Sequence, residues 1–357
     1  DRLVFAPEQN PTFSIKHIAR SSVATSQFFV WGAIGAGLIP IMLGFIFAQY
    51  VYALGPVLLA ILGGYSISAM LVATTAIAGK RSGLQTLVLA RAAFGVSGGK
   101  TVTPLLLLAK LVLGTLFFAA VINYSFDGSV VGLPALATPA FETMPISWLA
   151  IVTALFCIVA LALAIFGGRV LYLTQLIGGG LALLAALVFV LASLGGLDIS
   201  RIIWFDRFDQ PQLALTIGFA GLIAAIYGSV WATSAADFSR RVPMSESGRR
   251  VAIFVALGVG LIPVVLAMFG ALLAKASARL DGVTTPLQML RMLGAADYWA
   301  GSFALIGIAL TLLIWLASWL HSSSLGLRAI FSGLNRWLSQ VIILILVLLL
   351  VTVASQV

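Results

Sequence analysis

Charged residues are scarce in this sequence, and that scarcity excludes several classes of protein. Only 9% of the 357 residues are Asp, Glu, Lys or Arg, whereas soluble domains carry about 25%. Hydrophobic residues make up 61% of the chain, and its mean hydropathy is +1.14. One water-soluble core cannot bury so much apolar side chain. The composition therefore excludes a soluble enzyme, a nucleic-acid-binding protein and a disordered chain.

Cysteine and histidine are nearly absent as well. The single cysteine, Cys157, lies inside an apolar run and permits no intrachain disulfide. The two histidines, His17 and His321, are far apart in the sequence, and no cluster has the spacing of metal ligands. No glycine-rich phosphate-binding loop follows a strand pattern. We therefore expect neither an enzyme nor a cofactor-binding protein.

Long apolar runs fill most of the sequence. A membrane-spanning helix needs about 20 apolar residues, and the unbroken runs exclude an outer-membrane barrel, whose strands are short and alternating. We predict an all-α polytopic membrane protein that contacts the lipid bilayer. Its nine spans are predicted at 27–49, 54–79, 102–122, 147–166, 170–195, 212–235, 251–274, 299–327 and 338–355.

The positive charge gives the predicted orientation. Lys and Arg total 20, and the formal net charge is +9. Arg2, in the N-terminal tail, and Lys110, inside a span, are left out of the count. If the N-terminus is cytoplasmic, thirteen of the other eighteen basic residues lie on the cytoplasmic side and five on the opposite side. Positive residues favour cytoplasmic loops. We therefore predict a cytoplasmic (inner) membrane protein with a cytoplasmic N-terminus, rather than a protein that uses its charge to bind nucleic acid.

Two connectors suggest an internal repeat. The stretch 80–100 is predicted to be a cytoplasmic connector with a short amphipathic helix, and 284–294 a similar helix on the outer face. Each lies in the second connecting loop of a five-span unit, as in an inverted repeat. A tenth span is then missing, and we expect the chain to be part of a longer protein. The predicted organisation is a cytoplasmic segment 1–26, a first repeat 27–195 and an incomplete second repeat 212–357.

Span 1 contains the strongest sign of a broken helix. Gly32, Gly35, Gly37 and Pro40 fall within nine residues, and Gly and Pro weaken a helix. Non-helical backbone is tolerated at membrane depth only where it is buried or lines a cavity, as at the substrate and ion sites of transporters. The alternative is that the small residues only permit close helix packing.

Span 6 offers an aromatic pair beside small residues. Tyr227 and Trp231 lie four residues apart, on one helix face, with Gly228 and Ser229 between them. A flat heterocycle could stack on such rings. The alternative is an aromatic belt at the membrane interface, because Asp237 and Arg240 mark a nearby membrane edge.

Span 8 ends in a polar cluster that includes Ser318, His321 and Ser322. Serines in membrane helices often bond to their own backbone or to a neighbouring helix. His321 could carry a proton, because the reference pKa of histidine is near 6.5, but a histidine at a helix end is more often structural.

Lys110 is the least expected residue, because it lies near the middle of span 3. A charge at bilayer depth is costly and marks a functional site by default. No Asp or Glu falls within a predicted span, so we expect no carboxylate partner. The alternative is that the lysine extends toward the membrane surface.

Four segments resemble the nucleobase–cation symporters, the purine, cytosine and allantoin permease group. They are FFVWGAIGAG (28–37), SGLQTLVLARAAFGVSGG (82–99), SAADFSRRVP (234–243) and, more weakly, SWLHSSSLGL (318–327). The resemblance implies five-plus-five inverted repeats with broken spans 1 and 6, alternating access, and C-terminal helices that are absent from this chain. It also implies substrate binding between spans 1, 3, 6 and 8, with aromatic rings around the base and amides that clamp it.

The sequence departs from the family pattern at several of these positions. Thr115 follows Gly114 where an aromatic residue is usual, Gly228 stands at the usual aromatic position of span 6, and Ser318 replaces an asparagine. The stretch 312–316 offers no hydroxyl group for a sodium ion. We hypothesise that Lys110 supplies the missing charge, or that coupling is to protons.

The prediction is therefore a permease that imports a nucleobase or related small heterocycle by cation-coupled alternating access. A non-transporting membrane receptor or scaffold, and an amino-acid transporter of the same architecture, are the alternatives. The predicted coupling residues are Lys110 and His321. The predicted substrate-binding residues are Gly35, Ala36, Gly37, Leu38, Gly114, Thr115, Tyr227, Gly228, Ser229, Trp231 and Ser318.

Overall fold

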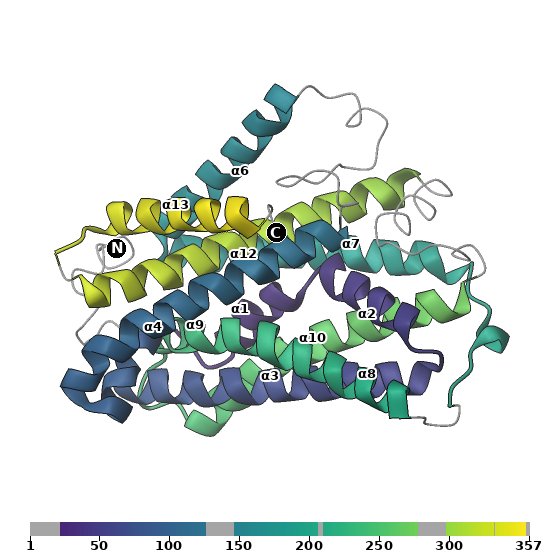
Figure 1. The fold of residues 1–357 in the computed structure, drawn as a ribbon, viewed down its shortest axis with the longest axis horizontal. Coiled ribbons are helices and arrows are strands. Elements are labelled where there is room, and N and C mark those ends of the chain that lie inside the picture. The colour runs from purple at the N-terminus through teal and green to yellow at the C-terminus, as the bar shows by residue number, and fades with distance from the viewer. Residues whose placement is uncertain (1–21, 126–145, 206–209, 278–297, 332, 355–357) are drawn as a thin grey trace.

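The computed structural model describes residues 22–125, 146–205, 210–277, 298–331 and 333–354. Within these ranges the chain is a set of helices, and most of the long ones run along one common direction (Figure 1). In chain order they are α1 (Ser26–Gly35), α2 (Leu38–Tyr50), α3 (Leu54–Ser82), α4 (Thr86–Ser125), α6 (Ile146–Phe166), α7 (Gly168–Leu194), the short 3-10 helix η2 (Ile199–Arg201), α8 (Gln210–Leu222), the π-helix η3 (Ile223–Gly228), α9 (Ser229–Ser239), α10 (Gly248–Ala276), α12 (Tyr298–Ile330) and α13 (Arg336–Ala354).

The helices account for the nine predicted spans. Six helices in the described residues are long and apolar enough to cross a membrane, and the bent pair α1 and α2 makes a seventh span. Two shorter apolar helices, at Ala154–Phe166 and Arg336–Leu350, match the predicted spans 4 and 9. The protein is therefore a multi-pass membrane protein, as the hydropathy predicts.

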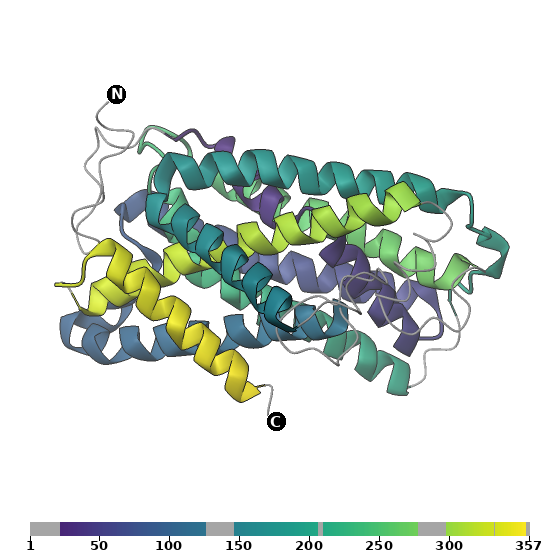
Figure 2. The same cartoon turned by 90° about the horizontal axis from the view of Figure 1, so that it is seen from above.

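The helices pack as two groups. In the first, which we call the α10 group, α10 packs against α3, α2 and α1, and α3 also packs against α8, η3 and α9. In the second, the α12 group, α12 packs along α7 and contacts α4, α6 and α13. Figure 1 shows α3 and α10 on one side of the molecule and α12 and α13 on the other, with α1 between them, and Figure 2 shows the same bundle from above. Because α1 contacts both α10 and α7, it lies at the boundary between the groups.

Glycines bring the backbones of α2 and α10 into direct contact. A Cβ atom added at Gly44 would lie 1.8 Å from the carbonyl oxygen of Ala267, and one added at Gly270 would lie 1.8 Å from that of Ile41. Close approach through small residues is a common way for membrane helices to associate. These two contacts hold α2 and α10 together as one unit.

Most of the described basic residues gather at one end of the bundle, which we call the basic end. There α3, α6, α9 and α12 end while α1, α4, α7, α10 and α13 begin. Hydrogen bonds tie these ends together, such as those from the Ser22 amide to the Arg241 carbonyl and from the Lys80 ammonium to the Met244 carbonyl. Arg201 and Lys275 lie at the opposite end, where the Asp198 amide bonds to the Ala276 carbonyl. The described residues thus carry the charge asymmetry that the sequence indicates.

The short helix predicted between spans 2 and 3 is present, whereas its cytoplasmic location and amphipathic character stay predictions. The chain forms a helix from Thr86 and turns at Gly95, whose φ of 72° and ψ of 177° interrupt α4 before span 3. Its predicted counterpart at 284–294 lies outside the described residues, and the division into two repeats stays a prediction.

Candidate functional site

Span 1 is broken, as predicted. The helix α1 ends at Gly35, α2 begins at Leu38, and the two are bent by 50°. Gly37 has a φ of 104°, a conformation that L side chains rarely adopt. A Cβ at Gly37 would also lie 2.2 Å from the hydroxyl oxygen of Thr311. The break therefore requires glycine both for its backbone conformation and for its contact with α12.

Side chains of α12 bond to carbonyls at this break. The Trp315 indole N–H donates to the Ile34 carbonyl at 2.6 Å. The Thr311 hydroxyl lies 3.1 Å from the Ala36 carbonyl and 2.8 Å from the Gly307 carbonyl of its own helix, so its one hydrogen is shared between the two acceptors. Both side chains are fully buried. Neither donor could be recognised from the sequence, because Thr311 stands one residue before the stretch 312–316 and Trp315 lies in an apolar run. Protein donors therefore stabilise the break from within the bundle.

Replacing Trp315 with phenylalanine tests this stabilisation. The substitution keeps an aromatic ring but leaves the buried Ile34 carbonyl without its indole donor. We expect the free energy of unfolding to fall by about 1–3 kcal/mol, measured by thermal unfolding of the detergent-solubilised protein. The matched control is Trp337→Phe at an exposed position, which should change little. Equal effects of the two substitutions would contradict the role of the indole N–H.

Span 6 changes helix type at its middle. The interruption implied by the resemblance takes the form of the π-helix η3 between α8 and α9, and the backbone stays helical across it. π-helical turns frequently occur at functional sites. The segment places Tyr227 and Trp231 toward Trp315, with ring centroids 6.5 and 6.2 Å away, and Tyr227 also meets Tyr65 at 5.3 Å. All four rings are buried inside the bundle, so the interfacial-belt alternative is wrong.

Gly114 and Gly228, two of the four glycines among the predicted substrate-binding residues, lie where helices pack closely together. A Cβ at Gly114 would lie 2.5 Å from the Trp319 ring, and one at Gly228 would lie 2.9 Å from the Ser68 hydroxyl oxygen. Thr115, next to Gly114, is buried and its hydroxyl has no hydrogen-bond partner among the described residues. The structure thus brings Ile34–Leu38, Tyr227 and Trp231 together around α12, whereas Gly114 faces Trp319 further along that helix.

Ser318 links the predicted site to a residue that the sequence analysis did not select. Its hydroxyl accepts a hydrogen bond of 2.9 Å from the amide nitrogen of Gln175 on α7. Both residues are buried. An amide is therefore present beside span 8, on α7 rather than at the position where the family pattern has its asparagine.

Lys110 is buried and bonded, and it has a carboxylate close by. Its ammonium donates to the Ser322 hydroxyl at 2.5 Å and to the Thr233 carbonyl at 3.3 Å. The Ser322 hydroxyl in turn donates to Asp237 Oδ2, and Asp237 Oδ1 accepts from the Thr86 amide at 2.8 Å. The lysine is only 1% exposed, so it does not extend to the surface.

The expectation that Lys110 has no carboxylate nearby is therefore wrong. The predicted span 6 ends at residue 235, because the charged residues that follow look like a membrane edge. The helix instead continues to Ser239. Asp237 is tolerated inside the bundle because Ser322 and the Thr86 amide both donate to it.

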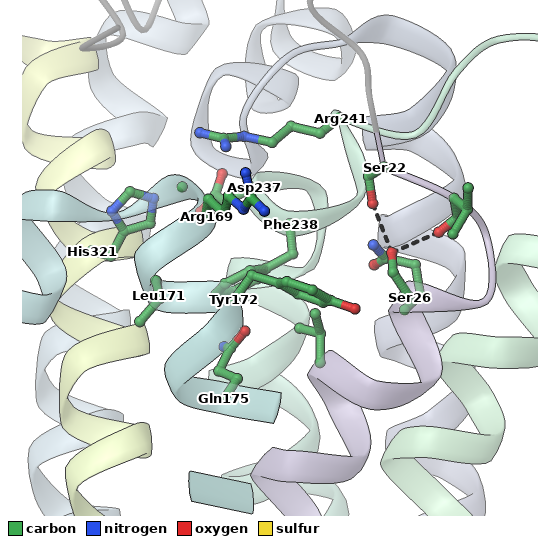
Figure 3. A pocket seen from close by; sticks show the side chains of 14 residues that line it. Ser22, Ser26, Arg169, Leu171, Tyr172, Gln175, Asp237, Phe238, Arg241 and His321 are labelled. Carbon is green, nitrogen blue, oxygen red and sulfur yellow. Dashed lines mark hydrogen bonds between the residues drawn. The ribbon is translucent and has the colours of Figure 1, made fainter. Parts of the chain in front are cut away.

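A cavity of about 540 Å³ opens beside this network at the basic end. Residues of α1, α7, α9 and α12 line it, so it lies between the two helix groups. Figure 3 shows Asp237 with Arg241 and His321 at one side of the cavity and the Tyr172 ring between Gln175 and Phe238. The Nδ1 atom of His321 lies 3.2 Å from the Ala164 carbonyl oxygen. The lining residues are Ser22, Val23, Ser26, Gln27, Val30, Gly168, Arg169, Leu171, Tyr172, Gln175, Asp237, Phe238, Arg241 and His321.

Comparison with known proteins identifies the fold. No protein-family model and no curated protein matches the sequence. Among solved structures, Mhp1, described as a nucleobase-cation-symport-1 family transporter in a closed conformation with bromovinylhydantoin bound, is 17% identical over 97% of this chain and 74% of that one, with a TM-score of 0.68. A Na⁺-coupled sialic acid symporter is 15% identical over 99% of this chain and 76% of that one, with a TM-score of 0.66. A manganese transporter of Eremococcus coleocola is 14% identical over 97% and 74%, with a TM-score of 0.57.

These similarities confirm the predicted all-helical transporter fold. The family resemblance read from the sequence motifs is supported at the level of the fold, because Mhp1 is among the similar structures. All three similar proteins are transporters. At these identities the likeness concerns the fold alone.

Proposed function

We propose that this protein is a secondary transporter that moves a nucleobase or a related small heterocycle across the membrane by alternating access, in symport with a cation. We further propose that it is a member of the nucleobase–cation symporters. The observation that carries the proposal is the broken span 1 at the boundary of two helix groups: its first half, α1, lines a cavity together with residues of both groups, and the break itself lies deeper in the bundle, outside the lining. Broken helices at a repeat interface are where transporters bind substrate and ions.

The lining of the cavity favours a flat heterocycle that carries amide groups. Gln27 is buried, and its side-chain carbonyl oxygen has no hydrogen-bond partner among the described residues. Gln175 lies in the same cavity, and Tyr172 and Phe238 supply aromatic rings. Nucleobases and hydantoins present N–H and C=O groups at the edge of a planar ring, which amide side chains can bond and aromatic rings can stack upon.

Counterflow in proteoliposomes tests the proposed function. Purified protein would be reconstituted into vesicles, and the vesicles would be preloaded with one unlabelled compound: adenine, cytosine, uracil, hydantoin or, for comparison, an amino acid. The uptake of the same labelled compound would then be measured. We expect exchange with at least one of the four heterocycles and none in protein-free vesicles. Exchange of amino acids alone would favour the amino-acid transporter, and no exchange with any compound would favour a non-transporting receptor or scaffold.

The amide of Gln27 gives a sharper test of the substrate class. Methionine has a similar length and no amide, so Gln27→Met removes the hydrogen bonds and keeps most of the volume. We expect the apparent affinity in counterflow to fall about tenfold or more, because a site built to bond a polar ligand loses that pairing. The control is Gln210→Met at the exposed start of α8, which should retain the affinity of the unchanged protein. Equal affinities in both variants would exclude Gln27 from the binding site.

The charge asymmetry supports an orientation for the transporter. Because basic residues favour the cytoplasmic side, we propose that the basic end faces the cytoplasm and that the cavity opens there. The protein would then be in an inward-open arrangement in the inner membrane. Labelling of an introduced exposed cysteine at Met244 or Tyr52 with a membrane-impermeant thiol reagent in intact cells would check this orientation, since only the residue on the outside should react.

A further inference from the structure

Asp237 differs from the other described carboxylates in its burial. It is 6% exposed, whereas Asp198 is exposed at the opposite end of the bundle and Glu246 lies in the turn after α9. A buried charge persists only where partners offset the cost of removing it from water. A single carboxylate buried among helices is therefore a candidate for a group that binds and releases a proton during function.

The bonds of Asp237 connect the two helix groups. Asp237 lies on α9, in the α10 group, and its bonding partners Ser322 and Thr86 lie on α12 and α4, in the α12 group. Lys110 on α4 bonds to the same Ser322 hydroxyl. A second bond joins α9 to the start of α4, from the Ala236 amide to the Thr86 hydroxyl at 3.1 Å. The carboxylate thus stands where one group must separate from the other during alternating access.

The same carboxylate can exchange protons with water. Asp237 is among the residues that line the cavity at the basic end, and Figure 3 shows it at the edge of that cavity. Water that enters the cavity can therefore deliver a proton to a carboxylate oxygen or accept one from it. No bond other than the O–H bond forms or breaks in this exchange.

We propose that Asp237 is the proton-binding site of the transport cycle, and that its protonation weakens the Asp237–Ser322–Lys110 link between the two helix groups. The proposal rests on the proposed transport function and adds the coupling ion and its site. In the charged form, Asp237 attracts Lys110 through Ser322 and holds α9 against α12 and α4. The neutral form loses this attraction, so α9 can separate from the α12 group.

Other charged or titratable groups surround Asp237 and set the conditions of the test. They are Lys110 on α4, Arg169 on α7, His321 on α12, and Arg240 and Arg241 close to it in the chain. Lys80 on α3 follows Gly79, which packs against Ala236. His321 could titrate in the same range as a switch of this kind. The His321→Gln variant is therefore required beside the Asp237 variant.

The test follows the opening of the cavity without any substrate. Cys157 would be replaced by serine, and Ser26, which is buried in the cavity lining, by cysteine. The labelling rate of this cysteine would be measured in proteoliposomes between about pH 5 and about pH 8. The rates would be divided by the thiolate fraction of this cysteine, measured at each pH in the folded form of each variant, so that ionisation of the thiol cancels. The same measurement would be made with Asp237→Asn, with His321→Gln and with the control Asp198→Asn.

We expect the corrected rate to change about tenfold over this range in the parent protein, a typical size for a coupling effect. The Asp198→Asn and His321→Gln variants should keep that pH dependence, and Asp237→Asn should abolish it. A pH dependence that survives in Asp237→Asn, or that disappears only in His321→Gln, would overturn the proposal. A rate independent of pH in the parent protein would overturn it as well.

Transport measurements separate this proposal from the proposed function. Where counterflow of a heterocycle is present, we expect a pH gradient, and not a sodium gradient, to drive its accumulation. The ratio of accumulation to counterflow should fall at least about tenfold in Asp237→Asn. Accumulation that requires sodium, or that is retained in Asp237→Asn, would overturn the proton site and leave the transport function standing. Absence of counterflow in the parent protein contradicts the transport function, and the thiol measurement then decides on the proton site alone.

Discussion

Replacing Gly270 with leucine is expected to prevent stable folding of the protein. The Cα of Gly270 lies against the Ile41 backbone of α2, where even a Cβ atom would come within 1.8 Å of a carbonyl oxygen. A leucine side chain fits only if the backbones of α2 and α10 move apart along their length. Overpacking ordinarily costs about 1–3 kcal/mol and occasionally more, and here we expect about 3 kcal/mol or more. The yield of monodisperse protein in detergent and its thermal unfolding temperature would measure the loss.

Gly180→Leu is the matched control for this prediction. Gly180 also lies in a long apolar helix, α7, but no atom of another helix among the described residues lies within 4 Å of the position of an added Cβ. The same substitution there should leave the unfolding temperature nearly unchanged. If the Gly270 and Gly180 variants behaved alike, the direct backbone contact between α2 and α10 would be contradicted.

Replacing Lys110 with methionine is expected to destabilise the protein strongly, and a second substitution is expected to restore part of the loss. Methionine fills similar space but leaves the buried carboxylate of Asp237 without the ammonium that Ser322 links to it. Removing one partner of a buried pair typically costs about 3–5 kcal/mol. In the double variant Lys110→Met with Asp237→Asn the uncompensated charge is absent, so a substantial part of that stability should return.

A double-mutant cycle measures this coupling. Unfolding of the parent, both single variants and the double variant in the same detergent gives the interaction free energy directly. We expect the double variant to be more stable than Lys110→Met alone. A double variant that is less stable by the sum of the single effects would show that Lys110 and Asp237 act independently.

Much of the fold could be predicted from the sequence because it depends on local properties. Apolar run length gives the spans, and the glycines and proline of span 1 indicate its break, since both are properties of neighbouring residues. The short helix before span 3 could be predicted for a similar reason, because this connector is only moderately apolar, whereas the turn at Gly95 was found only in the structure. Lys110 could be selected as functional because its cost at membrane depth does not depend on its partners.

The partners themselves could not be predicted, because they come from distant parts of the chain. Asp237 lies 127 positions after Lys110 and meets it only through Ser322, and Trp315 reaches the Ile34 carbonyl from a helix 281 positions away. Hydropathy also placed Asp237 outside span 6, because a hydropathy value reflects the charge of a residue and not the hydrogen-bond donors around it. Gln27 and Gln175 were missed for a related reason, because a glutamine near a span end is ordinary until a cavity is seen beside it.

The bend at Gly37 has a mechanical consequence. On the N-terminal side of the bend, α1 is a straight helix of ten residues, about 15 Å long at a rise of 1.5 Å per residue. Its far end carries Ser26 and Gln27 at the edge of the cavity, and both α1 and α2 pack closely on α10 through glycines, Gly258 for α1 and Gly270 for α2, so α10 has to move with α1. A rotation of only 10° about the bend would move that far end by about 2.6 Å, calculated from this length. Small torsions at one glycine are thus amplified, as by a lever arm, into changes as large as the width of a water molecule at the entrance.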